Sequence, residues 1–257
     1  MPSFPLMSEL PASLSTTGWS WSKIAKASHP SDGFFVGTDL QGNRWLTKLR
    51  GSFYAHREIV FARLAQAMRW SCQSSVFIRL DADSAHVLGR TLNEVHAAHW
   101  FLEEHPHPPC RADCALEALV GHEVHTLADL SFPLVTGLTD WPKSEIAAYI
   151  FGGNEPPGKL FTLSHELVVI DSEQMFSTGP CDFSNSPWLR SPSGESSPSG
   201  LRLANEVCAQ IGSLNQGTIE VALSIPPGFT VDLRWPVAPK LLLGVQFAAN
   251  YARGAEA

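Results

Sequence analysis

The sequence is short of charge, of basic runs and of long apolar stretches. Charged residues make up 17% of the chain, against about 25% in ordinary soluble proteins, and the formal net charge is −7. Nucleic-acid binders gain affinity by neutralising phosphates with clustered Lys and Arg. An acidic chain without such a cluster is therefore not expected to bind nucleic acid directly. No apolar run approaches the roughly 20 residues that span a bilayer, so we expect no membrane insertion.

Cysteines are few, odd in number and scattered, at Cys72, Cys110, Cys114, Cys181 and Cys208. This pattern fits reduced thiols better than a disulfide framework. The first residues carry no positive segment and include Glu9 in the one apolar stretch, unlike a signal peptide. The sequence therefore predicts a cytoplasmic protein. A shortage of charge together with eight Trp residues suggests that part of the surface is covered by a ligand or a protein partner.

The first half of the chain alternates between strand and helix patterns. Residues 1–30 have no sustained period and predict an irregular arm that docks through Trp19 and Trp21. Residues 33–49 contain two β-rich runs around Asp39-Leu40-Gln41-Gly42-Asn43, which is typical of a hairpin. Apolar residues then recur at three- and four-residue steps, which predicts a helix over 53–68 with Ser52 as its N-cap. Residues 76–80 read as a strand.

The second half is mostly helical in pattern. A helix is predicted from Pro142 to the Gly152-Gly153 pair, and a hairpin is predicted from the β-rich runs 159–163 and 166–171. Further helices are predicted over 93–104, 115–130, 201–214, 217–225 and 238–254. The Ser-, Pro- and Gly-rich stretch 182–200 predicts a mobile loop. Strands first and helices later predict an α+β fold with two lobes.

Lys48 and Glu58 form the first pair of chemical interest. Lys48 lies on a predicted strand after a glycine-bearing hairpin, and Glu58 lies in the first turns of the next predicted helix. Kinases use a strand lysine paired with a helix glutamate to hold nucleotide phosphates. The alternative is an edge-strand lysine and a solvated carboxylate without a role in binding.

Asp171 is the second candidate. It follows the aliphatic run Leu167-Val168-Val169-Ile170, so its carboxylate is expected at the end of a buried strand. Mg²⁺ prefers one or two carboxylates together with phosphate oxygens, and Glu173 could point the same way. The alternative is an ordinary turn aspartate at a strand end.

Together these motifs form an ordered series that resembles the HipA-like kinases, a bacterial branch of the protein-kinase fold related to phosphatidylinositol kinases. The resemblance rests on WLTKL around Lys48, on YAHREIVFARLAQAM after it, and on KLFTLSHELVVIDSEQMF, and it extends over residues 33–250. It implies a two-lobed kinase domain over 31–250, with an N-lobe of about 31–130 and a C-lobe of about 131–250. It also implies that Lys48 holds the phosphates of ATP, that Glu58 orients Lys48, and that Asp171 binds Mg²⁺.

The stretch GGNEPPGKLF departs from the family's catalytic loop, which reads roughly Asn-x-Asp-Arg-His-x-x-Asn. Aligned on Pro157-Gly158, the base position is Asn154, the His position is Pro156 and the metal-binding Asn position is Lys159. An amide is not a useful proton acceptor near neutral pH, and an ammonium repels Mg²⁺. Glu155 would have to act as a substitute base. Gly33, Gly37 and Gly42 also lack the spacing of a phosphate-binding glycine loop.

A second cluster lies between residues 96 and 125 and contains ligand types that zinc prefers: His96, His99, His105, His107, Cys110, Cys114, His122 and His125. No segment shows an established zinc-ligand order, and a polar loop explains the composition equally well.

Three hypotheses remain open. The first is a HipA-like kinase that transfers phosphate to a Ser/Thr or small-molecule acceptor. The second is an inactive pseudokinase that binds protein partners in a bacterial toxin–antitoxin or defence system, with or without nucleotide. The third is a zinc-stabilised interaction module. The altered loop favours the second hypothesis over full activity, and the retained Lys48, Glu58 and Asp171 disfavour the third.

Overall fold

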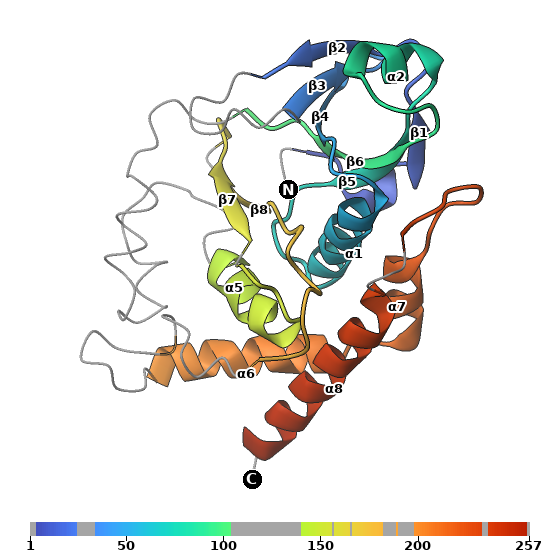
Figure 1. The fold of residues 1–257 in the computed structure, drawn as a ribbon. Coiled ribbons are helices and arrows are strands. Elements are labelled where there is room, and N and C mark those ends of the chain that lie inside the picture. Colours follow the sequence, from blue (N-terminus) through green and yellow to red (C-terminus); the bar gives the residue numbers. More distant parts are fainter. Residues whose placement is uncertain are drawn as a thin grey trace.

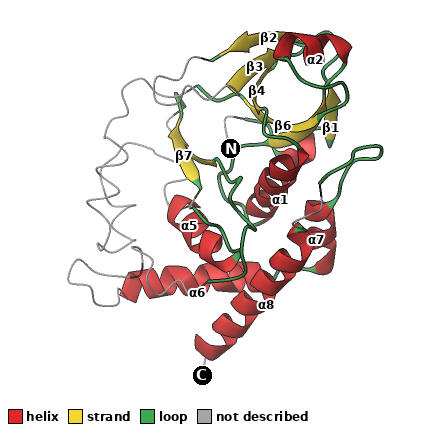
Figure 2. Cartoon of the chain, in the orientation of Figure 1, coloured by secondary structure: helices red, strands yellow, loops and turns green. Residues whose placement is uncertain are grey.

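A computed structural model describes residues 4–24, 34–103, 140–155, 157–164, 166–181, 189, 198–232 and 236–255. The predicted α+β class is confirmed, with a sheet in the N-terminal region and helices in the C-terminal region (Figures 1 and 2).

The N-terminal region is built on a six-stranded sheet in the order β1-β5-β6-β4-β3-β2. Only the β1–β5 pair is parallel, and the other neighbours are antiparallel. The strands are β1 (Ser13–Ser15), β2 (Ser20–Lys23), β3 (Phe34–Thr38), β4 (Arg44–Lys48), β5 (Ser75–Arg79) and β6 (Val95–Trp100).

The segment predicted as an irregular arm contributes both outer strands of this sheet, β1 and β2. Such short strands carry little pattern of their own and form by pairing with neighbours that are distant in sequence. The predicted docking of Trp19 and Trp21 is confirmed, because the Trp19 ring stacks on Trp45 with the centroids 6.2 Å apart and Trp21 donates to Ser84 Oγ.

The hairpin of β3 and β4 is confirmed, and its turn is held by one side chain. The Asp39 carboxylate accepts hydrogen bonds from the backbone N–H groups of Gln41 and Asn43 and from Trp45 Nε1. An aspartate that caps its own turn in this way fixes the register of the two strands, and that register places Lys48 at the end of β4, opposite Phe34.

Helix α1 (Ser52–Ala67) follows β4 and joins the two halves of the molecule. Ala55 and Ile59 pack against β5 and β6 in one cluster, while Phe61 and Leu64 pack with the C-terminal helices in another. Its N-cap is Gly51 rather than the predicted Ser52. Gly51 has a φ of 86°, a conformation that glycine adopts without strain.

The prediction of a helix over 93–104 is wrong, because residues 95–100 form β6. This strand lies in the middle of the sheet between β5 and β4, where pairing on both sides outweighs weak local helix propensity. A short helix that the sequence did not predict, α2 (Ala82–Leu88), precedes it. Asp81 caps α2 by accepting from the Ser84 N–H.

The C-terminal region contains four helices and a hairpin among the described residues. The helices are α5 (Asp140–Ile150), α6 (Pro198–Gly212), α7 (Gln216–Leu223) and α8 (Val237–Ala255), and the hairpin pairs β7 (Gly158–Phe161) with β8 (Leu167–Ile170). Residues 198–200 of the predicted mobile loop belong to α6, while 182–188 and 190–197 lie outside the described residues, as does the predicted helix over 115–130.

The main apolar cluster gathers α1, α5, α6, α8 and the β7–β8 hairpin. Figure 1 shows α1 between the sheet and these helices. Since α1 also packs on the sheet, the side chains of β4, α1 and β8 are brought to one place. Within the described part of the chain, no helix has both the length and the apolar character needed to cross a membrane.

Candidate functional site

Lys48 is the centre of a buried cluster of charges. Its side chain is 8% exposed, and its Nζ lies 3.0 Å from Glu58 Oε1 and 2.5 Å from Asp171 Oδ1. The three residues come from β4, from α1 and from the end of β8. The structure therefore brings together the three side chains that the sequence analysis named from separate motifs.

Glu58 is fully enclosed at this site, with only 3% of its side chain exposed. Burial alone would raise the pKa of a carboxyl group, but the charge of Lys48 and then that of His99 outweigh it and lower the pKa of Glu58 to about 2. Burial in turn opposes the charged form of Lys48, yet Glu58 and Asp171 raise the pKa of the ammonium above its usual value. The pair is thus held ionised.

Asp171 is placed at the boundary between the cluster and solvent. Its side chain is 50% exposed, in contrast to Glu58. It directly follows β8 and has a φ of 57°, which is uncommon for a residue with a side chain, although Asp tolerates it better than most. This turn aims the carboxylate back at Lys48 and leaves its other side open to a ligand.

Glu173 belongs to the same cluster, together with Arg50, which the sequence analysis did not name. Glu173 Oε1 accepts from Arg50 Nη1, while Glu173 Oε2 lies 3.8 Å from Lys48 Nζ. Oxygen atoms of Glu58, Asp171 and Glu173 all lie within 4.8 Å of one another. Arg50 follows Lys48 by two residues, so strand alternation could have suggested that both face the same way.

His99 contacts the carboxylate oxygen of Glu58 that Lys48 does not contact. Its Nε2 lies 3.1 Å from Glu58 Oε2, and its Nδ1 is 2.7 Å from Ser75 Oγ. The sequence analysis considered His99 only as a zinc ligand. Its actual neighbours depend on the pairing of β6 with β5 and β4, which no local motif reports.

His96 and His99 do not converge as a zinc pair. Three residues apart on a strand, their side chains point to opposite faces of the sheet, whereas a helix would have placed them together. His96 Nδ1 accepts from the Gly51 N–H, and its Nε2 lies 3.1 Å from Glu94. The other predicted zinc ligands, at residues 105, 107, 110, 114, 122 and 125, lie outside the described residues.

The stretch that departs from the kinase catalytic loop leads directly into β7. Asn154 and Glu155 are exposed, and Pro156 lies outside the described residues. No hydrogen bond or ion pair joins Glu155 to Lys48 or Asp171 within the described part of the chain. Lys159 Nζ lies 3.6 Å from the centroid of the Trp141 ring, a contact that favours a cation, on the opposite face of β7 from Gly158.

Gly158 itself lies against the candidate site. A Cβ atom there would be 3.3 Å from Asp171 Cβ, so the loop and Asp171 are neighbours. By contrast, Gly37 allows a ring to pack closely on the sheet, because a Cβ atom there would lie 2.5 Å from the Trp19 ring. Gly42 lies in the hairpin turn with a φ of 84°, and Gly33 lies outside the described residues.

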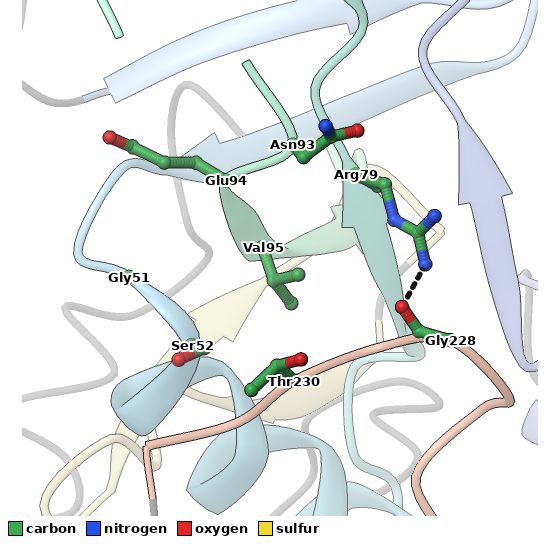
Figure 3. A pocket seen from close by; sticks show the side chains of 8 residues that line it. All are labelled: Gly51, Ser52, Arg79, Asn93, Glu94, Val95, Gly228 and Thr230. Carbon is green, nitrogen blue, oxygen red and sulfur yellow. Dashed lines mark hydrogen bonds between the residues drawn. The ribbon is translucent and has the colours of Figure 1, made fainter. Parts of the chain in front are cut away.

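A separate pocket of about 590 Å³ lies at the start of α1, between the β5 and β6 ends and the loop after α7. It is lined by Gly51, Ser52, Arg79, Asn93, Glu94, Val95, Gly228 and Thr230 (Figure 3). Arg79 reaches across its edge and donates to the Gly228 carbonyl. None of these residues belongs to the charged cluster, so the pocket is not its ligand cavity.

Comparison with solved structures finds distant similarity to a kinase. No protein-family model matches the chain, and no curated protein is significantly similar to it. The crystal structure of a Helicobacter pylori proinflammatory kinase, CtkA, aligns with 92% of this chain and 98% of its own, at 10% sequence identity and a TM-score of 0.43. A likeness at that level does not assign a function, which has to be argued from the charged cluster itself.

Proposed function

We propose that the chain binds a nucleoside triphosphate with Mg²⁺ at the Lys48–Glu58–Asp171 site, as a HipA-like kinase-family protein with weakened or lost phosphoryl transfer. The observation that carries the proposal is the position of Lys48 Nζ, in contact with carboxylates from α1 and from the end of β8. A lysine held by a helix glutamate, next to a half-exposed aspartate, is the arrangement that positions phosphates and their metal ion in kinases.

The residues present fit a divalent cation. Carboxylate oxygens of Glu58, Asp171 and Glu173 lie within 4.8 Å of one another, and Glu173 Oε2 is a buried oxygen without a hydrogen-bond partner among the described residues. Asp171 would hold the cation, which would neutralise charge on the phosphates. Lys48 would exchange its contact with Asp171 for a contact with a phosphate oxygen. It would keep its ion pair with Glu58, which holds the ammonium in position.

The altered loop is the reason to propose weak transfer. The exposed Asn154 stands where the family has its proton acceptor, and an amide cannot serve that purpose near neutral pH. Glu155 is the nearest carboxylate in sequence. If Glu155 acts as the base, an acceptor hydroxyl would have to bind outside the buried cluster, because Glu155 is exposed.

Thermal unfolding with ATP and MgCl₂ tests binding. A ligand that binds at 100 times its Kd stabilises the native state by about 2.7 kcal/mol, so a clear rise in melting temperature is expected for the wild type. Asp171→Asn should lose most of the rise, and Asp83→Asn on the exposed side of α2 should keep it. No rise in the wild type, or an unchanged rise in Asp171→Asn, would contradict the proposal.

The alternative is a pseudokinase that acts through a protein partner, and the loss of the loop aspartate favours it. Incubation with radiolabelled ATP and a cell extract separates the two. Transfer that disappears in Glu155→Gln would support a weak kinase with a shifted base. Nucleotide binding without any transfer would support the regulatory alternative.

A further inference from the structure

We propose that Glu173 is the second carboxylate ligand of the divalent cation, with Arg50 holding it in position. This inference rests on the proposed function and specifies the ligand set of the same site. In this ligand set, Glu173 takes the place of the metal-binding Asn of the family loop, because Lys159 stands at that loop position here.

The two oxygens of the Glu173 carboxylate have different surroundings. Oε1 accepts from Arg50 Nη1, which fixes the carboxylate. Oε2 is buried, has no hydrogen-bond partner among the described residues, and faces Lys48 Nζ at 3.8 Å. An ionised oxygen deprived of both water and a donor is costly. The Lys48 ammonium is too distant for a hydrogen bond, and a metal ion bound to Oε2 would supply the direct contact that this oxygen lacks.

Burial distinguishes Glu173 from an ordinary surface carboxylate. Its side chain is 7% exposed, whereas Asp171 beside it is 50% exposed. A cation bound between them would have one ligand from the protein interior and one from the boundary, with its remaining positions open towards solvent. Mg²⁺ is typically bound in this way, by one or two carboxylates with phosphate oxygens and water.

The charges of the cluster leave room for a divalent cation. The three carboxylates of Glu58, Asp171 and Glu173 share the two cations Lys48 and Arg50, and the His99 ring lies against Glu58. Lys48 is shared between Glu58 and Asp171. If the phosphates of a nucleotide draw Lys48 away from Asp171, the negative charge near Asp171 and Glu173 increases. Cation binding should therefore be stronger when nucleotide is present.

Lys159 does not compete for this role. Its Nζ lies over the Trp141 ring, on the opposite face of β7 from Gly158, which borders Asp171. Lys159, at the loop position that supplies a metal ligand in the family, thus points away from Asp171. The Glu173 carboxylate instead points into the charged cluster.

Mn²⁺ binding tests the inference directly. Free Mn²⁺ is titrated with the purified full chain and followed by electron paramagnetic resonance, with and without a non-hydrolysable ATP analogue. Glu173→Gln keeps the size of the side chain and an oxygen for Arg50, but it removes the charge. Loss of even an outer-shell partner commonly costs 10- to 100-fold in metal affinity, so Glu173→Gln should bind Mn²⁺ at least about tenfold more weakly in the presence of the analogue. Glu220→Gln, on the exposed face of α7, is the matched control.

Analogue binding without metal is measured in parallel by calorimetry, so that the two proposals can fail separately. Weaker Mn²⁺ binding by Glu173→Gln, with metal-free analogue binding unchanged, supports the inference. Equal Mn²⁺ affinities for Glu173→Gln and the wild type would overturn it and leave the proposed nucleotide site standing. Wild-type protein that binds the analogue but no Mn²⁺ would also overturn it. Absence of analogue binding in the wild type would overturn both.

Discussion

At the scale of single residues, the molecule is organised around one buried ammonium group. Lys48 is almost fully enclosed and contacts carboxylates that are 10 and 123 residues away in the chain. A buried charge pair contributes little to stability unless its geometry is good, yet breaking it is costly. Ionisable groups with strongly shifted pKa values cluster at functional sites, which is why this cluster is the candidate site.

The ionisation of Glu58 gives a prediction about acid stability. The pKa of Glu58 is about 2 in the folded chain, against an ordinary value of 4.5. A group whose pKa is lowered by folding contributes stability that is fully present above its unfolded pKa and is lost as pH falls through the folded value. Glu58 should therefore stabilise the wild type above about pH 4.5 and progressively less towards pH 2.

The measurement is the free energy of unfolding in urea at pH 5.5 and at pH 3. At 1.36 kcal/mol for each pKa unit, the loss between these pH values should be about 2 kcal/mol smaller in Glu58→Gln than in the wild type. Glu220→Gln should behave as the wild type. Equal losses in Glu58→Gln and the wild type would show that Glu58 is not held ionised by Lys48.

Part of the site could be read from single residues and part could not. Lys48, Glu58 and Asp171 each stand next to a regular element whose pattern is local, so their order predicted a common site. His99 has no such signal, and strand alternation indicates only the direction of Arg50, because each acquires its partner only when β4, β6 and the turn after β8 come together. Glu173 was considered beside Asp171, but its two different oxygens are a property of the folded chain.

At the scale of elements, the N-terminal hairpin is held by rings rather than by a glycine-rich phosphate loop. Trp19 and Trp21 lie over Gly37 of β3, and Trp19 stacks on Trp45 of β4. The sequence analysis considered Gly37 as part of an incomplete phosphate-binding loop. In the structure, its missing side chain is what lets the rings approach the strand.

Gly37→Ala should therefore destabilise the fold. The added Cβ would lie 2.5 Å from the Trp19 ring, and overpacking of this kind typically costs about 1–3 kcal/mol. Urea unfolding measures the loss, and Gly254→Ala, where a Cβ meets nothing within 4 Å, is the control. A change below about 0.5 kcal/mol at Gly37 would mean that the rings do not rest on β3 as described.

Elements with local signals were predicted and elements made by distant pairing were not. The helix predicted at 53–68 has an apolar period, and the β7–β8 hairpin has two short β-rich runs, so both were found close to their observed bounds. Strand β6 reads as a helix because Ala97, Ala98 and its two histidines carry no strand alternation. Its state is decided by β5 and β4 on either side.

At the scale of the whole molecule, α1 makes the sheet and the helices depend on each other. One face of α1 packs with Phe77 and Val95 of the sheet, and the other packs with Ile146 of α5 and Leu241 of α8. The Lys48–Asp171 and Arg50–Glu173 contacts add charge pairs across the same boundary. Both halves therefore share part of their core with α1.

The described regions should therefore unfold together. Circular dichroism at 222 nm follows mainly the helices, and tryptophan fluorescence also reports on the ring cluster of the sheet, which contains Trp19, Trp21, Trp45 and Trp100. The two signals should give the same urea midpoint, as expected of a cooperative transition. Two well-separated midpoints would show that the sheet and the helical region are independently stable.

The central claim is that phosphates of a nucleotide bind next to Lys48, and labelling with an acyl-phosphate derivative of ATP tests it most directly. Such a reagent transfers its acyl group to an amine that lies beside the bound phosphates. Mass spectrometry of the labelled chain should find the acyl group on Lys48, and an excess of unmodified ATP should suppress it, while labelling of Lys23 on β2 should be indifferent to ATP. A chain in which Lys48 is unlabelled, or in which ATP does not protect it, would contradict the assignment of this cluster as a nucleotide site.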